Sequence, residues 1–147
     1  MEITTLTLYT IAGALSASLS LVLLAFARFR PGTLVAKNYG LALLIFAAGF
    51  FSFGIGPALP RWVSVIATNM LLLSSCVLQY SGFAAFCAQR PAKLDRWGWA
   101  LVALSGPAFW YWGLIEPNGN YRSAVFSLAC AAINARTAFL LLRQALR

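Results

Sequence analysis

The polar side chains inside long apolar runs are the first candidates for chemistry in this sequence. Asn69 and Gln79 interrupt one such run, and Asn134 and Arg136 interrupt the last one. In a lipid environment a polar or charged group is costly, so these residues usually serve binding, coupling or helix contact. We therefore treat these four residues as the candidate ligand or switch positions.

Two interpretations of Arg136 remain open. It lies seven residues before Arg143, about 10 Å away along a helix that rises about 1.5 Å per residue. Its guanidinium could reach the lipid headgroups while its aliphatic stem stays in the apolar region. Alternatively, Arg136 and Asn134 face the interior of a helix bundle, where they line a polar pocket or form a two-state contact with the helix that contains Asn69.

The residues of most enzyme active sites are missing. The chain has no His, which excludes His-ligated haem, His proton relays and most catalytic triads. Cys76, Cys87 and Cys130 lie in apolar segments without the spacing of a disulfide scaffold or zinc site, and are interpreted as small hydrophobic residues. We find no phosphate loop, no paired carboxylates and no metal-ligand cluster, so we predict neither catalysis nor a cofactor for this chain.

The carboxylates are too few and too peripheral for proton transport. Glu2, Asp95 and Glu116 are the three acidic residues, and all of them fall near a chain end or in a gap between apolar runs. Arg136 consequently has no acidic partner inside an apolar run. This pattern disfavours a proton-coupled transporter or pump, which carries ionisable residues within its helices.

The composition shows what kind of element positions these residues. Of 147 residues, 61% are hydrophobic and 10% are charged, whereas soluble domains have about 45–50% apolar and about 25% charged residues. A chain this short cannot cover its surface with so few polar side chains in water. We therefore predict an all-α integral membrane protein whose lipid-embedded helices form one domain over residues 1–147.

Five apolar runs have the length of membrane spans. A span needs roughly 20 residues, and the gaps between the runs contain Pro, Gly or clustered charges, which end helices. The first run lacks the basic leader of a signal peptide, so it is expected to be retained as a helix. The predicted transmembrane helices cover about residues 6–29, 37–55, 62–87, 97–115 and 121–142.

The basic residues indicate orientation. The net charge of +8 comes from cations in short gaps, without the basic face interleaved with aromatic residues that binds nucleic acid, so no nucleic-acid partner is expected. Two cations, Arg61 and Arg122, lie on one side of the predicted bundle. Eight lie on the other: Arg28, Arg30, Lys37, Arg90, Lys93, Arg96, Arg143 and Arg147. The positive-inside rule then places the C-terminus in the cytoplasm and the N-terminus outside.

Small residues recur four apart along three of the predicted helices, and such stripes let helix backbones approach closely in lipid. They are Ala12, Ser16 and Ser20; Ala48, Ser52 and Gly56; and Ser123, Ser127, Ala131 and Ala135. Packing within the chain is one explanation. Homodimer formation is the other, and the last stripe is its best candidate because its helix leads out of the membrane.

Several short segments occur in an order and spacing typical of a known family. They are Leu59-Pro60-Arg61-Trp62-Val63-Ser64-Val65, Asn69 with Leu71-Leu72-Leu73, Gly82, Phe86, Arg90-Pro91, and Glu116-Pro117-Asn118 with Arg122 and Ser127. Together they resemble the N-terminal membrane region of bacterial diguanylate cyclases that carry a GGDEF domain. The resemblance extends from about Leu6 to the C-terminus and is most specific between Leu59 and Pro91.

The resemblance implies a location and a partner. In proteins of that kind the region lies in the inner membrane, and its last helix continues into the cytoplasm to a GGDEF domain that makes cyclic di-GMP from two GTP molecules as a dimer. This sequence stops at Arg147 with helical composition, as though cut just before such a domain. No GGDEF motif is present, so neither the cyclase activity nor any ligand residue is carried over.

The function expected from these observations is regulatory. We predict a membrane sensor or anchor module that positions and regulates a cytoplasmic output domain following Arg147, with the lipid bilayer and a second copy of the chain as further partners. The stimulus is not identified by the sequence. The alternative is a small multi-pass transport or partner-binding subunit, for which Asn69, Gln79 and Asn134 would have to converge on a midplane site.

Overall fold

The computed structural model describes residues 2–29, 34–88 and 96–146, and it is helical almost throughout. Its five long helices are α1 (Glu2–Phe29), α2 (Leu34–Gly54), α3 (Thr68–Ala88), α4 (Arg96–Trp110) and α5 (Gly119–Ala145). Within the described residues there is no strand. The prediction of an all-α fold is therefore confirmed.

Four helical segments are long and apolar enough to cross a membrane. They are Thr7–Phe29, Leu34–Gly54, Val63–Cys87 and Gly119–Ala145. The fifth helix, α4, has 15 residues and contains Pro107. It continues directly into a π-helical segment, η3 (Tyr111–Ile115). The third segment likewise begins with a π-helical stretch, η2 (Val63–Ala67), which leads into α3.

The helix ends lie within about one turn of their predicted positions, and the differences have local causes. The gap before the last helix was expected to extend to Asn120, but α5 begins at Gly119. The Asn118 side chain accepts hydrogen bonds from the backbone N–H groups of Asn120 and Tyr121 at 3.1 and 3.3 Å, the typical geometry of a helix N-cap. The predicted turn after α2 forms a short 3₁₀ helix, η1 (Gly56–Ala58). The other two predicted gaps lie partly in residues 30–33 and 89–95, outside the described residues.

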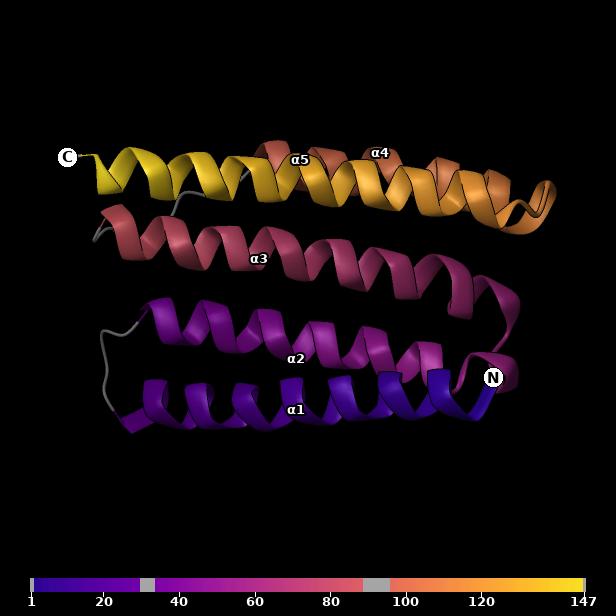
Figure 1. The fold of residues 1–147 in the computed structure, drawn as a ribbon, viewed down its shortest axis with the longest axis horizontal. Coiled ribbons are helices and arrows are strands. Elements are labelled where there is room, and N and C mark those ends of the chain that lie inside the picture. Colours follow the sequence, from indigo (N-terminus) through magenta and orange to yellow (C-terminus); the bar gives the residue numbers. More distant parts are fainter. Residues whose placement is uncertain (1, 30–33, 89–95, 147) are drawn as a thin grey trace.

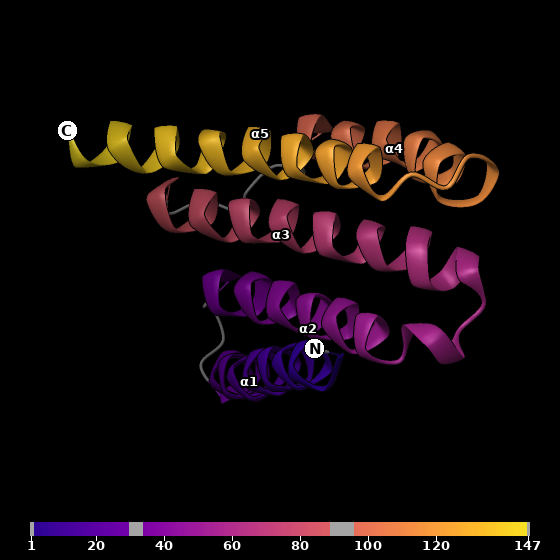
Figure 2. The same cartoon turned by 45° about the vertical axis from the view of Figure 1, so that its right-hand side comes forward.

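The helices run alternately up and down in a flattened bundle (Figures 1 and 2). In Figure 1, α1, α2, α3 and α5 lie side by side, and α4 lies behind, in contact with both α3 and α5. The starts of α1, α3 and α5 share one end of the bundle, which we call the N end. The last turns of α5 are at the opposite end, which we call the C end (Figures 1 and 2).

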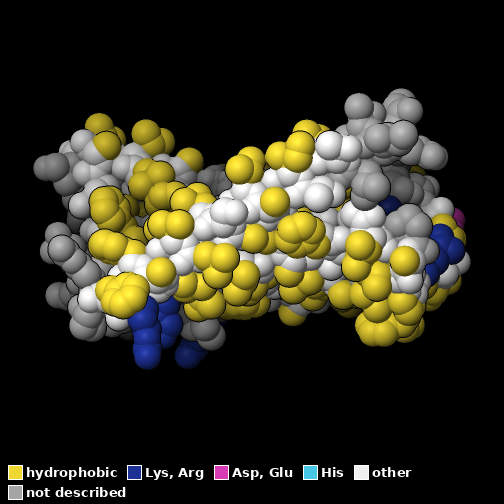
Figure 3. Space-filling model, turned by 90° about the horizontal axis from the view of Figure 1, so that it is seen from below, with side chains coloured by type: hydrophobic (Ala, Val, Ile, Leu, Met, Phe, Trp, Pro, Cys, Tyr) yellow, Lys and Arg dark blue, Asp and Glu magenta, His cyan; other side chains and the backbone are white. Residues whose placement is uncertain are grey.

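The main core lies where α3, α4 and α5 meet. Its buried members are Leu73, Val77, Val102, Phe109, Ala129 and Ile133. In contrast, α1 packs chiefly against α2, and large apolar side chains such as Leu8, Leu15 and Val22 are at least 64% exposed. Figure 3 shows that hydrophobic side chains cover this side of the molecule and that Lys and Arg gather near its two ends. An outer surface of this kind matches a lipid environment.

Small residues bring α2 close to both of its neighbours. The Ser20 hydroxyl of α1 donates a 2.7 Å hydrogen bond to the carbonyl of Gly40 in α2. A Cβ atom on Gly40 would lie 2.9 Å from Leu24 Cγ, and a Cβ atom on Gly49 would lie 2.6 Å from Leu72 Cδ2 of α3. Glycine therefore permits the close helix approach that supplies packing energy in lipid.

Replacing Gly49 with leucine should destabilise the bundle. The new side chain would occupy the position of Leu72 and push α2 away from α3, and overpacking of this kind costs about 1–3 kcal/mol. We expect this loss in the free energy of unfolding, measured by denaturant titration in detergent micelles. Gly119→Leu is the matched control, because nothing lies within 4 Å of a Cβ atom at that position. Equal stability of the two variants would contradict the observed packing.

Candidate functional site

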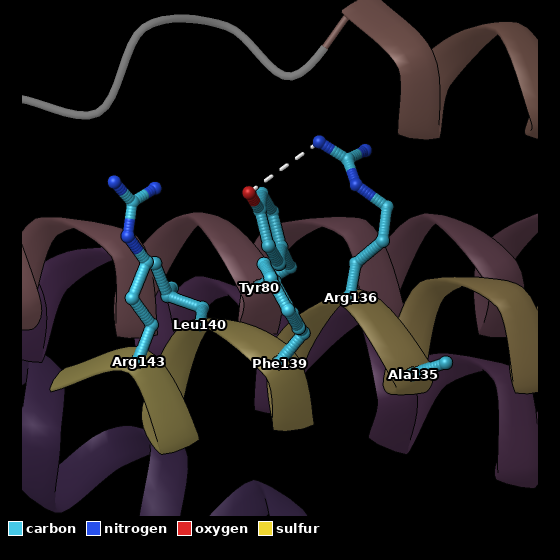
Figure 4. Close-up of a pocket in the computed structure, with 6 residues that line it drawn as sticks. All are labelled: Tyr80, Ala135, Arg136, Phe139, Leu140 and Arg143. Atoms are coloured by element: carbon cyan, nitrogen blue, oxygen red, sulfur yellow. Dashed lines mark hydrogen bonds between the residues drawn. The ribbon is translucent and has the colours of Figure 1, made fainter. Parts of the chain in front are cut away.

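Arg136 lies at the junction of three helices toward the C end (Figure 4). Its Nη2 donates a hydrogen bond to the Tyr80 hydroxyl of α3 at 3.4 Å. Its guanidinium carbon lies 4.8 Å from the centre of the Tyr80 ring and 5.7 Å from that of Trp97, near the start of α4. Both distances are within the range of a cation–π interaction. Arg136 therefore links α5 to α3 and α4.

Two surface cavities flank this arginine. One of about 460 Å³ is lined by Tyr80, Ala135, Arg136, Phe139, Leu140 and Arg143. The other, of about 430 Å³, is lined by Trp97, Ala132 and Arg136. In Figure 4 the side chains of Arg136 and Arg143 extend to the same side of α5, and the Tyr80 ring lies between them. Two arginines of α5 therefore line one cavity.

Asn69 has a structural role in its own helix. Its side chain is buried and its amide donates to the carbonyl of Val65 in η2. The neighbouring Thr68, also buried, donates from its hydroxyl to the Val63 carbonyl at 3.3 Å. Both groups thus stabilise the wide turn of η2, against which η3 packs so closely that a Cβ atom on Gly113 would lie 2.5 Å from Val65 Cγ1.

The other predicted polar residues do not form a shared polar site with Asn69. Gln79 is half-buried on α3, and Asn134 is exposed on α5. At 100° per residue, Asn134 is displaced around α5 by about 140° from the buried Ala129 and by about 100° from the buried Ile133, so it points away from the core that they join. Of the four predicted positions, Arg136 is the one that the structure places against a neighbouring helix with a side-chain hydrogen bond.

The predicted small-residue stripe of α5 faces away from the bundle. Ser123, Ser127, Ala131 and Ala135 are all exposed. The α5 residues in the buried core are Ala129 and Ile133 instead. Ala131 lies at the centre of an exposed surface that also includes Asn134, and we call these five residues the α5 outer face.

The structure pairs two cysteines whose proximity the sequence did not predict. The Sγ atoms of Cys76 in α3 and Cys130 in α5 lie 3.9 Å apart, and both side chains are half-buried. They are separated by 54 positions in the chain, so no local spacing could have signalled the pair. The contact lies where α5 packs against α3.

A larger apolar cavity lies elsewhere at the C end. It has a volume of about 650 Å³ and is bordered by residues of α1, α2, α3 and α5. Tyr39 and Phe83 line it and pack edge to face, with ring centres 5.5 Å apart. The described residues that line this cavity are uncharged and mostly apolar.

The described residues contain no group of three or more His, Cys, Asp or Glu side chains that could hold a metal ion. In comparisons with known proteins, no family model, curated protein or solved structure matches this chain. The structural features that bear on function are the contacts of Arg136 and the α5 outer face.

Proposed function

We propose that this chain is a membrane sensor or anchor module that positions and regulates a cytoplasmic output domain through α5. The observation that carries the proposal is the division of α5 into two unlike sides. One side is fixed to α3 and α4 by Ala129, Ile133 and the Arg136 contacts. The opposite side is the exposed α5 outer face. A helix so divided can transmit a change in bundle packing to a partner.

The proposed topology has five spans, with the N-terminus outside and the C-terminus in the cytoplasm of a bacterial inner membrane. Besides the four long apolar segments, α4 and η3 together run from Arg96 to Ile115. Twenty helical residues extend about 30 Å, the thickness of the hydrocarbon core. Arg28, Lys37 and Arg143 lie toward the C end, as the positive-inside rule requires of the cytoplasmic side.

The proposed second partner is another copy of the chain, bound at the α5 outer face. Small side chains there permit close approach of two helices. A side-chain amide in lipid is stabilised when it forms a hydrogen bond with the neighbouring helix. Asn134 makes no hydrogen bond with any other part of the chain that the structure describes. A two-fold contact would bring two such amides together, and the last turns of both α5 helices would emerge in parallel.

The proposed output domain is a GGDEF diguanylate cyclase, in line with the resemblance of the Leu59–Pro91 region. Such a domain acts as a dimer, so a shift in the spacing or rotation of two α5 helices would bias the making of cyclic di-GMP. Reading the coding sequence beyond Arg147 tests this directly. An in-frame GGDEF domain supports the proposal, whereas a stop codon immediately after Arg147 would contradict it.

The transport alternative gains little from the arrangement of polar groups. A transporter site needs polar side chains from several helices near the midplane. Asn69 donates within its own helix, and Asn134 lies on the outside of α5. A partner-binding subunit remains a second candidate, because the α5 outer face would serve an unlike helix as well as a second copy.

Arg136→Gln in the native gene product should change output while leaving the protein in the membrane. The substitution removes the cation–π contacts to Tyr80 and Trp97, worth about 0.5–1 kcal/mol each at exposed sites. A two-state equilibrium that depends on both contacts should shift roughly five- to thirtyfold, measured as cellular cyclic di-GMP per membrane-bound protein. Arg61→Gln, an exposed arginine at the N end, is the control. Unchanged output in the Arg136 variant would favour a passive anchor.

A further inference from the structure

We propose that Arg136, Arg143 and Tyr80 form a binding site for the phosphate headgroup of an anionic phospholipid. The cavity of about 460 Å³ that these residues line is large enough for a headgroup and the first part of its acyl chains. The site requires neither an output domain nor a dimer. It would give the module a chemical signal of its own, the anionic lipid content of the membrane.

Both arginines of the site belong to α5 and line the same cavity. They lie seven residues apart on α5, which is two helical turns and about 10 Å along the axis. Figure 4 shows both side chains extending to the same side of the helix. Arg143 is exposed and forms no hydrogen bond or ion pair with the described part of the chain. Guanidinium groups bind phosphate oxygens through two parallel N–H donors.

Tyr80 orients this pair. Its ring lies beneath the Arg136 guanidinium, and its hydroxyl accepts a hydrogen bond from Arg136 Nη2. That contact keeps the Arg136 side chain extended toward the cavity and leaves the Tyr80 O–H proton free to donate to a phosphate oxygen. The site therefore combines two guanidinium groups with one hydroxyl group. All three belong to α3 or α5, which pack against each other in the core.

The rest of the lining favours a lipid over a free anion. Phe139 and Leu140 line the same cavity, and Phe139 is 68% exposed. Next to a headgroup these side chains would contact acyl chains, whereas inorganic phosphate would leave them unused. The cavity also lies near the last turns of α5, where an apolar span gives way to Arg143, which is the depth of a lipid phosphate. Basic pockets between helices at this depth commonly bind anionic headgroups.

The charges around the site agree with an anionic ligand. No carboxylate lines the cavity among the described residues. Glu116 and the start of α1, which carries Glu2, lie at the opposite end of the bundle, and Asp95 falls outside the described residues. Among the described residues, the polar side chains that line this cavity are Tyr80, Arg136 and Arg143.

The test uses the full chain in zwitterionic detergent micelles, titrated with phosphatidylglycerol or, for comparison, phosphatidylcholine. Bound lipid is counted by native mass spectrometry. We expect phosphatidylglycerol to bind preferentially and Arg143→Gln to weaken it about fivefold, the factor that corresponds to the attraction of one cation to an anionic surface. The double variant Arg136→Gln/Arg143→Gln should lose on the order of 25-fold. Because Arg143 is exposed, its single variant keeps the proposal testable even if the double variant is unstable.

The matched control is Arg122→Gln, which removes a cation from the same helix at the N end. It should leave phosphatidylglycerol binding unchanged. The proposal is overturned if Arg122→Gln weakens binding as much as Arg143→Gln, because the attraction would then be unspecific. It is also overturned if phosphatidylcholine binds equally well, or if inorganic phosphate alone displaces the lipid, which would identify a site for free anions.

Discussion

Ala131→Ile should weaken self-association of the chain at least tenfold. Ala131 is at the centre of the exposed α5 outer face, so a β-branched side chain there would hold two α5 helices apart. Overpacking costs about 1–3 kcal/mol at a close contact, and in a symmetric dimer it occurs in both copies. Energy transfer between labelled chains in lipid vesicles, measured over a series of protein-to-lipid ratios, gives the dissociation constant.

Ala14→Ile is the control for this measurement. Ala14 is also exposed but belongs to α1, so the substitution adds the same side chain to a different outer surface. Asn134→Leu should have a smaller effect than Ala131→Ile, about threefold, because interhelical hydrogen bonds in membranes average about 0.6 kcal/mol. If the wild-type chain stays monomeric at all ratios, or if Ala14→Ile disrupts the dimer instead, α5 is not the interface.

Oxidation with an apolar copper–phenanthroline complex should join Cys76 and Cys130 within one chain nearly completely. Their Sγ atoms are 3.9 Å apart, so they need to approach by about 2 Å to reach the bond length of about 2.05 Å. The reagent accepts the two electrons, and the two thiol protons pass to solvent. Labelling with maleimide should then find one reactive thiol in place of three.

The third cysteine provides the control for the cross-link. Cys87→Ser should leave the cross-link intact, whereas Cys76→Ser or Cys130→Ser should abolish it. The joined form would fix α5 against α3, so in the native gene product it should also make output insensitive to Arg136→Gln. A bond formed between chains, or none at all, would show that α3 and α5 are not in contact as described.

The helices themselves were predictable because lipid imposes simple requirements. An apolar run of about 20 residues that ends at Pro, Gly or a charge becomes a helix almost regardless of its neighbours. The predicted boundaries of the first and fourth helices, 6–29 and 97–115, accordingly agree with the structure within about one turn. The small differences in helix boundaries come from local hydrogen bonds that a hydrophobic pattern does not predict. An example is the Asn118 cap, with which α5 begins earlier than expected.

The contacts between helices were not predictable, because they depend on which side of each helix meets which neighbour. The π-helical segments η2 and η3 meet at Val65 and Gly113, far apart in the sequence. Trp97 and Arg136 are likewise in contact although they belong to different helices. In an apolar sequence every side of a helix looks alike, so a hydrophobic pattern alone cannot distinguish lipid-facing from buried surfaces.

The restriction of α1 to contacts chiefly with α2 has a consequence for biosynthesis. The α1–α2 hairpin consists of neighbouring segments, and its Ser20–Gly40 hydrogen bond forms between residues only 20 positions apart. Local contacts form early, and chains begin to fold from the N-terminus while they are still being made. We therefore expect the hairpin to assemble in the membrane before α5 leaves the ribosome, so that the part of the bundle that contains α5 is completed last.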